Sequence, residues 1–149
     1  MRPPEPEMPS SRPDAGRLSG AQVMVIDDNA ANVLVLKRLL ELAGIGKVHG
    51  FTDPRAALER CFRSPPDALL LDLRMPDLDG IAVLRALRSD RRVGVSVPVL
   101  VLTADDDTEI MRSALDAGAE DFLAKPFDLN EVLFRVRKLL ESGQRTGPQ

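Results

Sequence analysis

Four short runs of this chain, most of them apolar, each end in residues that can carry chemistry. They are 23–26 before Asp27 and Asp28, 68–71 before Asp72, 99–102 before Thr103, and 121–124 before Lys125. Nearly continuous Val, Leu and Ile runs separated by helix-like stretches are typical of a parallel sheet buried on both faces. Ligands bind beyond the carboxyl ends of the strands in such sheets. The sequence therefore predicts that three carboxylates, a hydroxyl and an ammonium meet at one edge.

The rest of the pattern predicts five strand-helix units in one domain. The expected strands are 21–26, 47–51, 67–71, 97–102 and 119–124, and the expected helices are about 30–43, 54–63, 80–89, 106–117 and 128–141. Asp53 and Pro54 form an N-cap followed by a proline at the first helical position, and Gly44 is a helix stop. Because crossovers between parallel strands are right-handed, we expect a doubly wound α/β fold with helices on both faces.

Composition sets the domain limits and excludes several function classes. Residues 1–20 hold five prolines and no periodic apolar face, which predicts a disordered arm before a single domain at 21–142 and a flexible tail at 143–149. A net charge of −3 gives no electrostatic reason to bind nucleic acid or an anionic membrane. The chain has no apolar stretch near the ~20 residues that span a bilayer. Cys61 is the only cysteine and is expected in the core, which fits a cytoplasmic protein.

The predicted cluster suits a divalent cation and a phosphoryl group. Asp27 and Asp28 are adjacent, but the backbone turns at the strand end, so both can approach one cation. Asp72 is the candidate nucleophile, since bound Mg²⁺ and Lys125 would offset the repulsion between a carboxylate and a phosphoryl group. The plainer alternatives are a solvated acidic pair at 27 and 28 and a loop-capping role for Asp72.

These residues resemble the receiver domain of two-component response regulators, and the resemblance covers about 21–142. The matching motifs are Val-Ile-Asp27-Asp28-Asn29, Leu-Leu-Leu-Asp72-Leu-Arg-Met-Pro-Asp-Leu-Asp-Gly80, Leu-Thr103-Ala104, Gly118-Ala119-Glu120-Asp121-Phe122 and Lys125-Pro126-Phe127. The resemblance implies a flavodoxin-like five-stranded parallel sheet of order 2-1-3-4-5. It also implies a phosphorelay signalling domain rather than an enzyme, phosphorylated on Asp72 with Mg²⁺ by a sensor histidine kinase or phosphotransfer protein, and slowly dephosphorylating itself.

The resemblance also implies a role for each site residue. Asp28, Asp72 and the Arg74 carbonyl would hold Mg²⁺, with Asp27 acting partly through metal-bound water. Thr103 and Lys125 would bind phosphoryl oxygens. Thr103 and Phe122 would form the conformational switch. The plainer alternative for Phe122 is a core aromatic. Arg74 and Asp105 occupy the positions that tune phosphoryl lifetime, and their opposite charges could pair. The Lys125-Pro126 peptide bond is expected to be cis.

The resemblance further suggests a weak homodimer through one charged face. The four residues that match the family's pairing positions are Glu120, Asp121, Arg135 and Arg137. A third pair looks broken, because Met111 stands opposite Glu131 where a base would be expected. The alternative is that these charges are simply solvated. Which kinase and which output partner are involved stays open at this point.

Other functions fit this sequence less well. A flavin-binding electron carrier shares the fold plan, but the chain has no Trp or Tyr and no phosphate-binding loop after its first strand. A haloacid dehalogenase-type phosphatase would need a second Asp where Arg74 stands. A pseudo-receiver without chemistry is disfavoured because every expected reactive position is filled. His49 is an ordinary strand histidine, and the arginines at 85, 88, 91 and 92 indicate a solvated face rather than direct nucleic-acid binding.

Overall fold

The computed structural model describes residues 18–74, 79–90, 97–103 and 108–146, and these contain one five-stranded parallel sheet of order β2-β1-β3-β4-β5. The strands are β1 (Gln22–Ile26), β2 (Lys47–Phe51), β3 (Ala68–Asp72), β4 (Val99–Thr103) and β5 (Asp121–Ala124). The helices are α3 (Ala30–Leu42), α4 (Pro54–Arg63), α5 (Gly80–Ser89), α6 (Thr108–Asp116) and α7 (Leu129–Thr146). The predicted fold class and strand order are confirmed.

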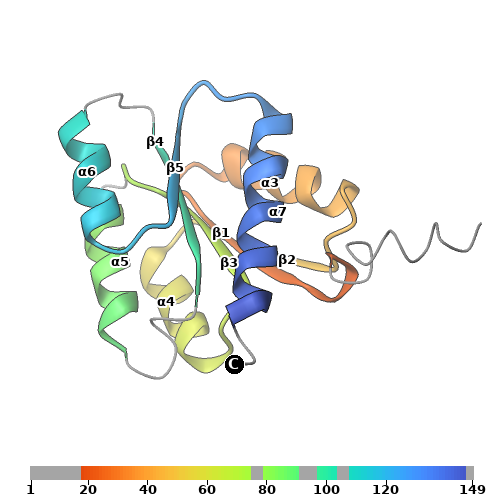
Figure 1. Ribbon diagram of the computed structural model, residues 1–149, viewed down its shortest axis with the longest axis horizontal. Helices are drawn as coiled ribbons and strands as arrows, with labels where there is room; N and C mark the ends of the chain where they lie inside the picture. Colours follow the sequence, from red (N-terminus) through yellow and green to blue (C-terminus); the bar gives the residue numbers. More distant parts are fainter. Residues whose placement is uncertain (1–17, 75–78, 91–96, 104–107, 147–149) are drawn as a thin grey trace, which may run out of the picture.

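Helices cover both faces of the sheet and enclose two apolar cores. Helices α3 and α7 lie on one face, while α4, α5 and α6 lie on the other (Figure 1). Side chains alternate along each strand, so Met24 and Leu71 enter one core while Val25 and Leu70 enter the other. Strands β3 and β4 are buried along their whole length, which explains their nearly unbroken apolar sequence.

The strand register brings the ends of four strands to one edge. Ile26 pairs with Leu71, Asp72 with Leu102, and Thr103 with Ala124. The residues that directly follow β1 and β5 therefore lie level with the last residues of β3 and β4. This register places the predicted reactive side chains next to one another.

Local sequence signals set where the helices begin and end. The side chains of Asn29, Asp53 and Asp79 cap α3, α4 and α5 by accepting backbone N–H groups. Pro54 begins α4, and Gly44, with φ +102°, follows the end of α3. The predicted cap, proline and stop are confirmed. The Lys125-Pro126 peptide bond is cis, as the resemblance implied.

The chain termini differ from the expectation where they are described. Residues 18–20 form a helical turn, and the Leu18 carbonyl accepts the N–H groups of Ala21 and Gly46 at 3.2 and 2.8 Å. A Cβ on Gly46 would collide with the Ser19 carbonyl, so the turn and this glycine fit closely. Helix α7 continues to Thr146, five residues beyond the expected end at 141, because the single Gly143 does not stop it. The remainder of the expected arm, 1–17, and of the expected tail, 147–149, lies outside the described residues.

Two smaller predictions concern Cys61 and membrane spans. Cys61 is fully buried on α4, its thiol lies 3.5 Å from the Met24 sulfur, and burial raises its pKa to about 11. It is the core residue that the sequence predicted. No helix among the described residues is both long and apolar enough to cross a bilayer.

Candidate functional site

Three of the predicted site residues are buried polar residues at the carboxyl edge of the sheet. Asp27 is 1%, Asp72 5% and Thr103 0% exposed, whereas Asp28 is exposed. Asp72 and Thr103 close β3 and β4, and Asp27 and Asp28 directly follow β1. Buried polar side chains are uncommon unless they are bonded or functional. The edge is therefore the natural candidate site.

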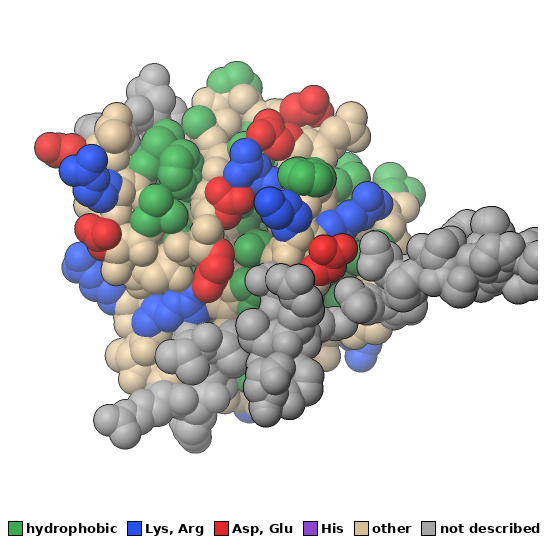
Figure 2. Space-filling model, in the orientation of Figure 1, with side chains coloured by type: hydrophobic (Ala, Val, Ile, Leu, Met, Phe, Trp, Pro, Cys, Tyr) green, Lys and Arg blue, Asp and Glu red, His purple; other side chains and the backbone are tan. Residues whose placement is uncertain are grey.

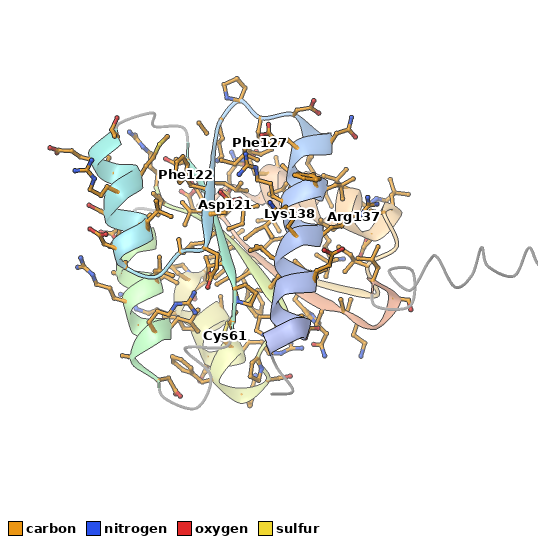
Figure 3. The ribbon with its side chains drawn as sticks, in the orientation of Figure 1. Cys61, Asp121, Phe122, Phe127, Arg137 and Lys138 are labelled. Atoms are coloured by element: carbon orange, nitrogen blue, oxygen red, sulfur yellow. The ribbon has the colours of Figure 1, made fainter. Side chains whose placement is uncertain are left out.

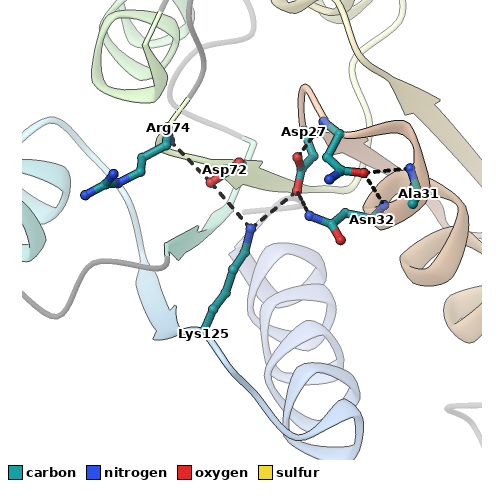
Figure 4. Close-up of polar contacts among 7 residues, drawn as sticks. Asp27, Ala31, Asn32, Asp72, Arg74 and Lys125 are labelled. Carbon is teal, nitrogen blue, oxygen red and sulfur yellow. Dashed lines mark hydrogen bonds and ion pairs between the residues drawn. The ribbon is translucent and has the colours of Figure 1, made fainter.

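Asp27 is held through both of its carboxylate oxygens (Figure 4). Its Oδ1 accepts the backbone N–H of Asn29 at 2.9 Å, and its Oδ2 accepts the side-chain amide of Asn32 at 3.3 Å. The same Oδ2 lies 3.5 Å from the Nζ of Lys125. The start of α3 thus supplies two of the donors that fix this carboxylate.

Lys125 lies between the two buried carboxylates. Its Nζ is 3.5 Å from Asp27 Oδ2 and 3.7 Å from Asp72 Oδ1 (Figure 4). Its backbone N–H donates to the Thr103 carbonyl at 2.6 Å, which ties the end of β5 to the end of β4. Asp72 Oδ1 also accepts the backbone N–H of Arg74 at 3.2 Å. The ammonium is thus placed to stabilise negative charge on a group bound at Asp72.

The carboxylates of Asp27, Asp28 and Asp72 form a group that fits a divalent cation. One oxygen from each lies within 4.8 Å of the others. Hard carboxylate oxygens are the ligands that Mg²⁺ prefers, and Mg²⁺ sites commonly use one or two carboxylates together with waters. When ionised, the three carboxylates carry three negative charges against the one ammonium that lies between Asp27 and Asp72. A dication would neutralise the difference.

The Asp72 carboxyl has a perturbed pKa. Burial, followed by the nearby negative charge of Asp27, raises the pKa of Asp72 from an ordinary 3.8 to about 6, and Lys125 only partly opposes this shift. Perturbed ionisable groups gather at functional sites, because function requires the burial and like charges that a stable fold avoids. Ionising Asp72 in the folded protein is unfavourable because of burial and the negative charge of Asp27, and a bound cation would offset this repulsion.

This shift predicts how stability depends on pH. At pH values between the ordinary pKa of 3.8 and about 6, Asp72 is protonated in the folded state and ionised in the unfolded state. The protonated carboxyl therefore adds stability at low pH, and this stability is lost as pH rises through about 6. In EDTA, we expect Asp72→Asn to be more stable than wild type near pH 8, by at most about 3 kcal/mol, and this advantage to shrink towards about pH 5. Urea unfolding across that range measures it. A stability difference that does not change with pH would contradict the prediction.

The remaining predicted site residues are only partly described. Phe122 is half-buried and packs against the core under α4, α5 and α6, and Figure 3 shows it between α6 and β5. This contact agrees with the core-aromatic reading and leaves the switch role a prediction. Arg74 is exposed, and Asp105 lies outside the described residues, so their expected pairing also stays a prediction.

Arg88 departs from the expected solvated basic face. Its guanidinium donates to the Gly118 carbonyl at 2.6 and 3.2 Å, to the Val97 carbonyl at 2.6 Å and to Glu120 at 3.0 Å. Glu120 in turn accepts the backbone N–H of Val99 at 2.7 Å. Arg88 therefore joins α5 to the chain that enters β4 and β5, at the edge opposite the site. Arg85 is exposed as expected, and residues 91 and 92 lie outside the described part.

The charges expected at a dimer face are largely paired within the chain. Arg135 contacts both carboxylate oxygens of Asp121 at 2.7 and 2.8 Å and Glu131 at 3.1 Å, while Glu120 binds Arg88. Arg137 is exposed on α7, where Figure 3 labels it together with Asp121 on β5. Figure 2 shows acidic and basic side chains beside one another over this face.

Comparison with known proteins identifies the family. A family model described as the response regulator receiver domain matches residues 23–137. The chain belongs to this family. The chain is 45% identical over 127 residues to the response regulator MprA of Mycobacterium leprae. The aligned region covers 85% of this chain and 53% of that protein. The chain thus spans about half the length of the curated relatives it matches.

Solved structures agree with this assignment. A putative response regulator from Chloroflexus aurantiacus is 30% identical, with a TM-score of 0.76 over 81% of this chain and 98% of that one. The receiver domain of the sensor histidine kinase PA1611 from Pseudomonas aeruginosa is 31% identical, with a TM-score of 0.74 over 82% and 98%. That structure is described as having a magnesium ion coordinated in its active site cleft. The receiver domain is a signalling domain of two-component systems, so the flavin carrier and the phosphatase are set aside.

Sequence reasoning missed two residues that the structure brings into contact with others. Asn32 was not singled out, although its spacing of three residues from the cap residue Asn29 places it in the first turn of α3, beside the site. The sequence groups Arg88 with the other arginines of this region. The signal that distinguishes it is its position on α5 beside the buried Leu84 and Leu87, which places it on the inner side of the helix.

Proposed function

We propose that this receiver domain is phosphorylated on Asp72. The observation that carries the proposal is the contact of a buried carboxylate with an ammonium 3.7 Å away, at an edge where two further carboxylates converge. Buried nucleophiles of this kind are rare outside sites of chemistry. The phosphoryl donor is a phosphohistidine of a sensor histidine kinase or phosphotransfer protein, as in the two-component systems to which the family belongs.

In the proposed step, an Asp72 carboxylate oxygen forms a bond to phosphorus as the phosphorus-nitrogen bond of phosphohistidine breaks. The bonding pair leaves with the imidazole, and the product is an acyl phosphate on Asp72. Lys125 and the Thr103 hydroxyl stabilise the phosphoryl oxygens, because Thr103 closes β4 and Lys125 follows β5 at the edge that holds Asp72. Slow hydrolysis of the acyl phosphate returns the domain to its resting form.

The proposed ligands of Mg²⁺ are Asp28, Asp72 and the Arg74 carbonyl, with Asp27 acting partly through metal-bound water. When bound, Mg²⁺ supplies positive charge that offsets the repulsion between the carboxylates and the incoming phosphoryl group. The carboxylate group described above supports this set, because its three oxygens already lie close together.

The proposed output is a change of protein-protein contacts. Thr103 would move towards the phosphoryl group, and Phe122 would fill the space that Thr103 leaves. These two movements form a packing change between two states, and the charge of the phosphoryl group favours one of them. The output partner is a protein, with no direct binding of nucleic acid. The proposed compartment is the cytoplasm, which suits a chain whose single cysteine is a buried free thiol.

Arg74 and Asp105 are proposed to tune the lifetime of the acyl phosphate. They carry opposite charges at the two positions that have this role in the family, and an exposed pair of this kind contributes only ~0–1 kcal/mol. Neutralising both is expected to speed dephosphorylation by only a few-fold, about 1 kcal/mol of barrier. Slower dephosphorylation would instead assign Arg74 to assisting the attacking water.

A weak dimer through α6, β5 and α7 is the proposed phosphorylation-sensitive assembly. Because Asp121 and Arg135 already pair within the chain, Arg137 is the better residue to test. With beryllofluoride, a phosphoryl mimic, we expect Arg137→Glu to weaken dimerisation in sedimentation velocity. Arg55→Glu, on α4 at the other face of the sheet, is the control. A mimic-induced dimer that both variants leave unchanged places the interface elsewhere.

The phosphoacceptor function is tested by treating the purified chain with acetyl phosphate, with and without Mg²⁺. Intact-mass spectrometry is expected to show a single phosphoryl adduct only when Mg²⁺ is present, because the carboxylates must be neutralised before an anion can react. A chain that gains no adduct with Mg²⁺, while a kinase-linked phosphohistidine also fails to transfer, is not a phosphoacceptor.

A further inference from the structure

Asn32 lies beside the site without belonging to the residues assigned to it. It occupies the first turn of α3 and is half-buried. Its Nδ2 donates to Asp27 Oδ2 at 3.3 Å (Figure 4). It also lines a cavity of about 260 Å³ between α3 and the chain after β5. Val35, Lys125 and Phe127 line the same cavity.

Helix capping does not explain the choice of asparagine at this position. The backbone N–H of residue 32 is already accepted by the Asn29 side chain at 3.2 Å, so the start of α3 is capped without the Asn32 amide. Much of the cavity wall is apolar, formed by Val35, Leu36 and Phe127, and an apolar side chain would suit it. A half-buried amide is favourable there only if its hydrogen bond offsets the desolvation.

The Asp27 carboxylate needs a second neutral donor to have a defined orientation. The terminal torsion of an aspartate side chain is soft, so the N–H of Asn29 on Oδ1 alone leaves the other oxygen free to swing. Lys125 Nζ is 3.5 Å from Oδ2, but it also faces Asp72 at 3.7 Å and would follow a phosphoryl group. The Asn32 amide is tied to Asp27 and not to Asp72.

We propose that Asn32 is a positioning residue for the metal site, and the proposal rests on the function proposed above. By holding Oδ2, the amide fixes the plane of the Asp27 carboxylate, so that its oxygens face Asp28 and Asp72 before a cation enters. Partners that orient a ligand in this way commonly change metal affinity 10–100-fold when they are removed, as an order of magnitude.

The test compares Mg²⁺ binding to the full chain by isothermal titration calorimetry. Asn32→Leu removes the amide at similar volume, and we expect the Mg²⁺ dissociation constant to rise about tenfold or more. Asn32→Ala, a strong helix former, repeats the test if leucine is not tolerated. Asn32→Gln keeps an amide and is expected to restore much of the affinity. Val35→Ala alters the same cavity wall on the same helix without touching a carboxylate, and is expected to bind Mg²⁺ as wild type does.

Each outcome bears on the proposal. Melting temperatures measured alongside show whether a variant is folded, and a purely structural role would lower them without changing the dissociation constant of the folded chain. Equal Mg²⁺ affinity in wild type, Asn32→Leu and Asn32→Ala overturns the positioning role alone. An equal loss in Val35→Ala assigns the effect to the cavity wall and also overturns it. A wild-type chain that binds no Mg²⁺ overturns the proposed function together with this inference.

Discussion

Asp72→Asn is expected to abolish the Mg²⁺-dependent phosphoryl adduct completely. An amide has no charged oxygen to attack phosphorus, yet it has nearly the same shape, so the end of β3 keeps its packing. The variant also removes one negative charge from a site where burial and Asp27 raise the pKa of Asp72 to about 6. The loss of reaction is therefore expected in a chain that is folded as well as wild type.

Intact-mass spectrometry after acetyl phosphate treatment measures this result. The matched control is Asp79→Asn, on the loop that leads from β3 into α5, where the carboxylate accepts the Ala82 N–H at 2.8 Å as a helix cap. Asparagine caps helices as well as aspartate does, so this control is expected to gain one phosphoryl group like wild type. If Asp72→Asn still gains a single phosphoryl adduct, the phosphoacceptor is another carboxylate of the group and not Asp72.

Arg88→Met is expected to lower the free energy of unfolding by about 2–4 kcal/mol, the largest stability effect predicted for this domain. The guanidinium bonds the carbonyls of Gly118 and Val97 and the carboxylate of Glu120, so its removal leaves three acceptors without this donor. Most of the expected loss lies with the two carbonyls, because the Glu120 side chain is 44% exposed and its ion pair is screened by solvent. Methionine retains the aliphatic stem, which limits the change to the polar contacts.

Urea unfolding measures the effect, and Arg85→Met is the control. Arg85 is exposed on the same helix, so its substitution is expected to change stability by less than about 0.5 kcal/mol. Because Arg88 lies at the opposite edge of the sheet from Asp72, Arg88→Met should still gain a phosphoryl adduct at a temperature where it is folded. Equal stability of the two arginine variants would show that the Arg88 contacts contribute nothing net.

The carboxyl edge could be predicted from the sequence because its signals are local. Each reactive residue directly follows or closes a strand, and a parallel sheet aligns strand ends, so Asp27, Asp72 and Thr103 had to meet. The contacts of Arg88 and Asn32 carry no such signal. Both depend on which way one helical residue faces in the folded chain. Arg85 and Asn29 have the same chemistry, but Arg85 is exposed and the Asn29 side chain caps α3. The end of α7 was placed too early for a related reason, since one glycine in polar surroundings does not decide where a helix stops.

The turn at residues 18–20 bears on where this domain can be cut. The Leu18 carbonyl accepts the Gly46 N–H, and the Ala21 carbonyl accepts the Lys47 N–H at 3.1 Å, so two successive amides entering the edge strand β2 depend on the segment before β1. Leu18 also packs against the core under α3 and α7. A shortened protein that starts at Ala21 would keep every residue of the chemical site but expose an apolar corner and leave the Gly46 amide to solvent. A protein cut at or before Leu18 keeps both of these contacts, so we expect it to be more stable than one that starts at Ala21.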